Sequence, residues 1–85
     1  MEYYVYCLMS KKNQQFHYYG FTSLDVESRL KRHNKGDVRS TKAYRPLKIV
    51  GFKRFNNKKE AISFEKKLKR SADFRNKFIE SFKLD

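Results

Sequence analysis

The chain has 85 residues, which suits one domain with a small core, and its single cysteine excludes a disulfide framework and zinc sites built on paired cysteines. No apolar run could span a membrane and no signal-peptide core is present, so we expect a soluble, cytoplasmic protein. Residues 28–70 hold 16 Lys and Arg against three acidic residues and account for the formal net charge of +12. This basic stretch also carries aromatic side chains, which favours a nucleic-acid partner over a membrane or a general solubility surface.

The first quarter of the chain predicts a β-hairpin. Residues 2–9, E-Y-Y-V-Y-C-L-M, are rich in aromatic and β-branched side chains and predict a strand. Alternation places Val5 on one face of this strand and Tyr6 on the other. Residues 16–21, F-H-Y-Y-G-F, follow a polar turn and predict an antiparallel second strand. Gly20 would allow another backbone or a ligand to approach this strand closely.

Residues 23–34, S-L-D-V-E-S-R-L-K-R-H-N, predict the first helix. At about 100° per residue, Val26 and Leu30 face the core. Arg29 and His33 then lie one turn apart at the edge of the same face. Two interpretations of this arginine remain open, a functional group placed beside the core or a side chain whose stem covers apolar surface.

The ends of this helix and the loop after it carry local signals. Thr22 or Ser23 is expected to cap the helix, with Asp25 in its first turn. Gly36 is expected to end it. The following residues, 35–46, predict a basic loop that ends at a proline.

The second half of the chain predicts one strand and two helices. Residues 47–55 alternate as a third strand, and two asparagines after it can cap a helix over 58–70. Residues 71–83 carry Phe and Ile on one face and predict a last helix. We therefore expect residues 1–85 to form a single α+β domain, with a three-stranded, mainly antiparallel sheet flanked by about three helices.

One carboxylate stands out on the helix over 58–70. Glu65 falls on the apolar arc, in the gap between Ala61 and Ile62. Burial of a carboxylate is costly unless it is paired or binds a metal. Its position alone favours an ordinary ion pair, with a nearby lysine or with Arg29, and leaves a metal ligand as the alternative.

Five short motifs follow one another across nearly the whole chain: Y-V-Y at 4–6, Y-Y-G at 18–20, S-R-L-K-R-H-N at 28–34, S-T-K-A-Y-R-P at 40–46 and F-E-K-K-L-K at 64–69. In this order they resemble the GIY-YIG nuclease domain. The resemblance is to small stand-alone bacterial members, which are similar to the N-terminal domain of the excinuclease component that incises damaged DNA. Tyr4 and Tyr19 depart from the G-I-Y and Y-I-G tripeptides, at positions that carry no chemistry in the family.

The resemblance implies phosphodiester hydrolysis with one weakly bound divalent cation, Mg²⁺ or Mn²⁺. Glu65 would be its sole protein ligand, and water and phosphate oxygens would complete its coordination. Tyr6 would be the general base or would orient the attacking water, and Tyr18 would hold the water or the phosphate. Arg29 would clamp the phosphoryl oxygens, and His33 could supply a hydrogen bond or a proton. For the three ring residues the alternative is a role in aromatic packing.

The same resemblance extends to substrate binding. Many members carry an asparagine on the last helix, for which Asn76 is the candidate. Basic side chains would hold the nucleic-acid backbone without reading its sequence, namely Arg39, Lys42, Arg45, Lys66, Lys69 and Arg70.

We therefore predict a metal-dependent endonuclease that acts on DNA, directed by structure or damage as in repair or recombination. A partner protein could deliver its substrate. One alternative is a non-catalytic nucleic-acid-binding module that kept the fold and the basic surface. A more distant one is a basic protein associated with RNA or the ribosome.

Overall fold

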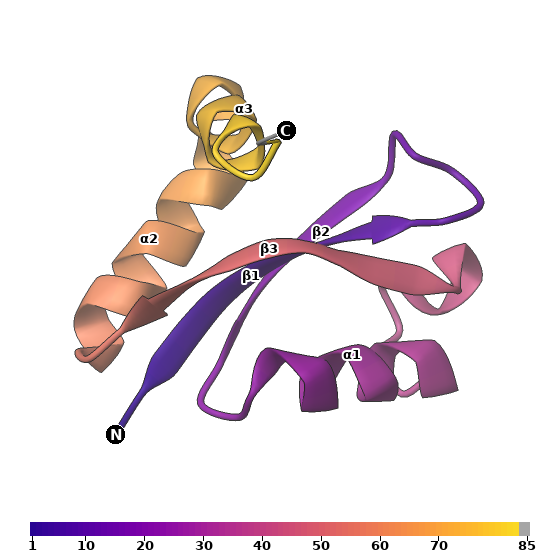
Figure 1. Ribbon diagram of the computed structural model, residues 1–85, viewed down its shortest axis with the longest axis horizontal. Coiled ribbons are helices and arrows are strands. Elements are labelled where there is room, and N and C mark those ends of the chain that lie inside the picture. The colour runs from indigo at the N-terminus through magenta and orange to yellow at the C-terminus, as the bar shows by residue number, and fades with distance from the viewer. Residues whose placement is uncertain (84–85) are drawn as a thin grey trace.

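A three-stranded antiparallel sheet forms the centre of the molecule, with strand order β2-β1-β3 (Figure 1). The computed structural model describes residues 1–83. Its strands are β1 (Tyr3–Ser10), β2 (His17–Thr22) and β3 (Leu47–Phe55). The three predicted strands are confirmed, with ends that differ by at most one residue. Because β1 pairs with a strand on each side, its side chains lie at the centre of the sheet.

Helices cover both faces of this sheet. Helix α1 (Val26–Lys35) lies on one face, and α2 (Lys58–Arg70) and α3 (Ala72–Glu80) lie on the other (Figure 1). A short 3₁₀ turn, η1 (Lys42–Tyr44), interrupts the loop before β3. The predicted α+β architecture is therefore confirmed. Among the described helices, none combines the length and the apolar character that a membrane span requires.

The start of α1 differs from the prediction. The N-cap is Asp25, whose Oδ1 accepts a hydrogen bond from the Ser28 backbone N–H at 2.9 Å. The prediction that Thr22 or Ser23 caps this helix is wrong. Thr22 ends β2, and its hydroxyl oxygen accepts from the Leu24 N–H at 2.9 Å instead. The chain uses the next three residues to turn from the strand into the helix, so the cap falls later in the sequence.

The other helix ends follow the sequence signals more closely. Gly36 ends α1 in the left-handed conformation with φ 88°, and Asn57 caps α2 through its side chain. Ser71 caps α3, which ends at Glu80, three residues before the predicted end. The 3₁₀ turn was missed because its support is tertiary. The Tyr44 ring in η1 stacks on Phe16, with centroids 3.7 Å apart.

The alternation of β1 divides the buried side chains into two clusters. Val5 and Cys7 face α2 and α3, and Tyr6 and Leu8 face α1. The first cluster also includes Ala61, Leu68 and Phe78, and the second includes Val26 and Leu47. These clusters attach a helix layer to each face of the sheet. Tyr6 is therefore held on the α1 face by the central strand.

Candidate active site

Two tyrosines and a histidine form a ring cluster on the α1 face of the sheet. Tyr6 is fully buried, and its hydroxyl oxygen lies 3.1 Å from His33 Nε2, in hydrogen-bond contact. Tyr18, on β2, is the cross-strand partner of Leu8 on β1. Because Leu8 and Tyr6 lie on the same face of β1, Tyr18 shares that face. The Tyr18 ring centroid is 4.9 Å from that of His33 and 6.2 Å from that of Tyr6. The structure thus brings together three of the residues named from the sequence.

A glycine on β2 makes room for the Tyr6 ring. Gly20 is the cross-strand partner of Tyr6, and a Cβ atom built on it would lie 2.5 Å from both Cζ and Oη of that tyrosine. The sequence indicated a close approach at this glycine by a backbone or a ligand. The group that approaches is the side chain that carries the hydroxyl.

Arg29, on α1, lies close enough to Tyr6 and His33 for its charge to affect both of their pKa values. Burial raises the pKa of Tyr6 above its ordinary value of 10, and the neighbouring Arg29 guanidinium opposes this effect. The Nε atom of Arg29 is buried, and it has no hydrogen-bond partner within residues 1–83. The functional interpretation of Arg29 stays a prediction, and the buried Nε is the observation that bears on it.

Glu65 lies on α2, and its charge acts on Tyr6 from a distance. Its side chain is 18% exposed, and its carboxylate lies 3.2 Å from Lys69 Nζ, one turn along the helix. Its negative charge contributes to the raised pKa of Tyr6. Within the described chain it makes no hydrogen bond to Tyr6 or Arg29. The carboxylate is therefore within electrostatic range of the hydroxyl and is paired with a half-exposed lysine.

His33 is neutral in this environment. Burial, and then the charge of Arg29, lower the pKa of His33 from 6.5 to about 4. Its Nδ1 atom lies 2.8 Å from the hydroxyl oxygen of Thr41, which is also fully buried. The sequence did not identify Thr41, because a polar residue in an aperiodic loop gives no signal of the side chain it meets.

Comparisons with known proteins identify the family of this chain. The family model described as the GIY-YIG catalytic domain matches residues 2–78. The chain belongs to the GIY-YIG family. It is also similar to a UPF0213 protein of Pediococcus pentosaceus, with 38% identity over 52 residues. That match covers 60% of this chain and 55% of the relative, so the chain spans little more than half of the relative's length.

A solved structure supports the same assignment. The solution NMR structure of a UPF0213 protein from Bacillus halodurans shares 31% sequence identity with this chain, with a TM-score of 0.57. The similarity covers 98% of this chain and 86% of that one. The resemblance drawn from the five motifs is confirmed, and so is the fold. A GIY-YIG domain suggests a nuclease.

GIY-YIG nucleases generally use divalent metals, and the residues here fit a sparse site. No group of three or more His, Cys, Asp and Glu side chains gathers within residues 1–83. Glu65 is a single carboxylate whose Lys69 partner is 54% exposed, and such helix pairs contribute little free energy. Mg²⁺ is commonly bound by one or two carboxylates, with waters and substrate phosphates as its other ligands. Glu65 could hold such an ion when substrate is present.

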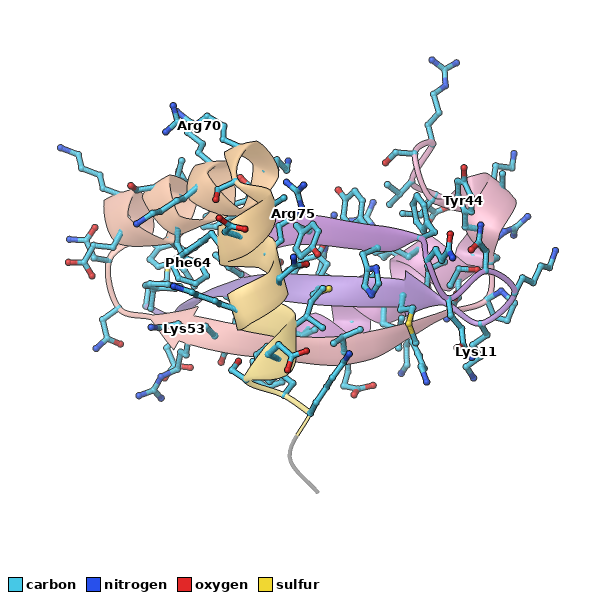
Figure 2. The ribbon with its side chains drawn as sticks, turned by 90° about the horizontal axis from the view of Figure 1, so that it is seen from above. Lys11, Tyr44, Lys53, Phe64, Arg70 and Arg75 are labelled. Carbon is cyan, nitrogen blue, oxygen red and sulfur yellow. The ribbon has the colours of Figure 1, made fainter. Side chains whose placement is uncertain are left out.

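The predicted backbone-binding residues of this GIY-YIG domain fall into two groups. Around η1, Arg39 and Lys42 are exposed, whereas Arg45 is partly buried and donates from Nε to the Lys42 carbonyl at 2.9 Å. On α2, Lys66 and Arg70 are exposed, and Figure 2 shows Arg70 pointing away from the sheet. Lys69, the remaining member of this group, is the partner of Glu65.

Asn76 lies apart from the ring cluster. It is exposed on α3 and faces a groove whose walls include His17, Lys48 and Ile79. None of the five residues assigned to catalysis borders this groove. The structure therefore does not bring Asn76 together with Tyr6, and its assignment as an active-site residue receives no geometric support.

Proposed function

We propose that this protein is a metal-dependent endonuclease that cuts DNA, directed by structure or damage as in repair or recombination. The observation that supports this most directly is the surroundings of the Tyr6 hydroxyl. It contacts His33, and the charges of Arg29 and Glu65 both act on it. Phosphodiester hydrolysis needs a group that accepts a proton from water, a cation that stabilises charge on the phosphoryl oxygens and a ligand that holds the metal ion. Tyr6, Arg29 and Glu65 are residues of these three types, which supports the proposal.

In the proposed reaction, water attacks phosphorus as the bond to the leaving oxygen breaks. Because burial raises the pKa of Tyr6, the phenol stays protonated at neutral pH. Tyr6 therefore orients the water through its oxygen, and it accepts a proton from the water as its own proton moves toward His33. This favours the orienting role over a phenolate formed in advance. The leaving oxygen takes its proton from solvent.

The remaining groups would bind the phosphate and the water and would stabilise the charge that develops on the phosphoryl oxygens. Arg29 would place its guanidinium, with its unpaired Nε, on the phosphoryl oxygens and stabilise the charge that develops there. Tyr18 would hold the water or the phosphate from β2. A divalent ion on Glu65, Mg²⁺ or Mn²⁺, would supply Lewis-acid stabilisation of the same charge.

The chemistry of the basic surface supports the proposed substrate class. The exposed cations around η1 and on α2 are suited to phosphate contacts, which fix position on the nucleic acid but carry no sequence information. This supports recognition of shape over base sequence. A branched or damaged duplex offers such a shape, and a partner protein could deliver it.

The test is cleavage of a panel of duplex, branched and single-stranded DNA and RNA with Mg²⁺ or Mn²⁺. We expect nicking that EDTA abolishes and that falls about 100-fold or more in Glu65→Gln and in Arg29→Lys. Glu60→Gln is the matched control, because Glu60 is an exposed carboxylate in the first turn of the same helix. This variant should cut at the wild-type rate.

Three results would overturn parts of the proposal. Salt-sensitive binding without cleavage of any substrate, unchanged by the Glu65 and Arg29 substitutions, would indicate a non-catalytic binding module. Cleavage that survives EDTA would contradict the metal dependence. Cleavage of RNA but not DNA would replace the substrate class.

A further inference from the structure

Thr41 is a buried side chain that the proposed reaction does not yet use. It occupies the N-cap position of η1, where a threonine would ordinarily accept a hydrogen bond from the backbone of the turn. It makes no such side-chain bond here. Its hydroxyl oxygen lies 2.8 Å from His33 Nδ1 and 3.4 Å from the Val38 carbonyl oxygen. The hydroxyl is thus directed at the histidine instead of the helix end.

The contacts of the two His33 ring nitrogens are compatible with either neutral tautomer. The Val38 carbonyl can only accept, and a donation of the single Thr41 hydroxyl proton to it, across 3.4 Å, selects one of them. The hydroxyl oxygen then accepts from His33 Nδ1–H. A neutral imidazole carries one N–H, so Nε2 is bare and accepts from the Tyr6 hydroxyl at 3.1 Å.

We propose that Thr41 is a positioning residue that holds His33 in the tautomer protonated at Nδ1, so that Nε2 can take the Tyr6 proton. Its effect on catalysis rests on the proposed nuclease function. In this arrangement the Tyr6 oxygen keeps its lone pairs for the attacking water. One proton passes from water to Tyr6 Oη and another from Tyr6 Oη to His33 Nε2. The opposite tautomer would place a proton on Nε2 and block this transfer.

The tautomer can be measured without any nuclease activity. In ¹⁵N-labelled protein at neutral pH, the ring nitrogen shifts of His33 should show a protonated Nδ1 and a bare Nε2. His17→Gln assigns the signals, since His17 is the other histidine of the chain. A wild-type His33 protonated at Nε2 would overturn the proposal, whether or not the protein cuts DNA.

Two substitutions separate the hydroxyl from the shape of the side chain. Thr41→Val keeps the shape and removes the hydroxyl, so His33 should lose its single tautomer. Thr41→Ser keeps the hydroxyl, and it should retain the wild-type ring signals. If Thr41→Val retains the wild-type tautomer, Thr41 does not set it, and the proposal fails.

The same pair tests the effect on cleavage. With the DNA substrate that the wild type cuts, kcat should fall about 10- to 100-fold in Thr41→Val with KM unchanged, and Thr41→Ser should restore it. Ser40→Ala, at the exposed neighbouring position, is the control and should have no effect. A changed tautomer with unchanged kcat would refute the catalytic role of Thr41. If no substrate is cut by the wild type while Thr41→Val still changes the tautomer, the nuclease function fails and the positioning of His33 by Thr41 stands.

Discussion

Gly20 and Tyr6 are cross-strand neighbours, and the phenol ring fills the space that a side chain at the glycine would need. A Cβ atom at Gly20 would lie 2.5 Å from the Tyr6 hydroxyl oxygen, far inside van der Waals contact. Gly20, the last residue of the Y-Y-G motif, therefore leaves the space that the ring of Tyr6, in the Y-V-Y motif, occupies. The two motifs are one structural unit, in which the absence of a side chain on β2 lets the hydroxyl from β1 reach His33.

Gly20→Ala should therefore displace the Tyr6 ring from His33. We expect cleavage to fall about 100-fold and the free energy of unfolding to fall by about 1–3 kcal/mol, as for other overpacked sites. Single-turnover cleavage and urea denaturation measure the two effects. Gly51→Ala is the matched control, because a Cβ there would meet the Phe82 ring on the opposite face of the sheet. It should lose stability and keep the wild-type rate, and an equal loss of rate in both variants would contradict this role of Gly20.

The Nε of Arg29, which has no partner among residues 1–83, predicts a conflict between stability and activity. A buried donor without a partner costs about 1–3 kcal/mol, so replacing it by an apolar side chain of similar length should not destabilise the fold. Arg29→Met should unfold at the same urea concentration as the wild type or a higher one, and it should lose cleavage. Its His33 pKa should rise from about 4, because the charge of Arg29 helps to lower it.

The control for this variant lies on the same helix. Arg32→Met removes an exposed guanidinium from α1 and should change neither the His33 titration nor cleavage at the site. If Arg29→Met lowers the free energy of unfolding by more than about 2 kcal/mol, the arginine is a structural residue.

The lowered pKa of His33 predicts how stability depends on pH. As the pH falls from 6.5 to about 4, the unfolded chain protonates this histidine and the folded chain does not. The unfolded state then binds more protons, so His33 removes stability across this window, by about 3 kcal/mol in total. Urea denaturation of the wild type and His33→Gln at pH 7 and pH 4 isolates this contribution. Parallel pH profiles of the two proteins would contradict it.

The sequence was sufficient for the parts of the fold that depend on periodicity. Strand alternation placed Tyr6 and Tyr18 on one face, and the helical repeat placed Arg29 and His33 at its edge, because side-chain direction follows directly from backbone geometry. The metal and backbone-binding roles came from the family resemblance. They remain predictions, since no ligand tests them.

The remaining details depend on contacts that periodicity does not encode. The N-cap of α1 is Asp25, later in the sequence than predicted, because the turn that follows β2 takes up the intervening residues. Thr41 meets His33 through a loop whose path is set by tertiary contacts, among them the stack of Phe16 and Tyr44. Local sequence signals do not report partners that the fold brings together from separate segments.

Asn34 provides the clearest of these unpredicted contacts. Its side-chain oxygen accepts from the Leu47 N–H at 2.7 Å, and its amide nitrogen donates to the Leu47 carbonyl at 3.1 Å. The pair joins the last turn of α1 to the first residue of β3. Both ends of the loop that carries Thr41 are therefore held together by one side chain.

Asn34→Ala should release this loop. We expect a loss of about 1–3 kcal/mol in the free energy of unfolding, because the backbone groups of Leu47 lose two hydrogen bonds. Faster hydrogen exchange should follow at the Thr41 and Lys42 amides, which both donate to the Val38 carbonyl. Asn76→Ala, at an exposed position on α3, should leave both quantities unchanged. Unaltered exchange in the Asn34 variant would show that the loop is held by its aromatic stack and not by α1.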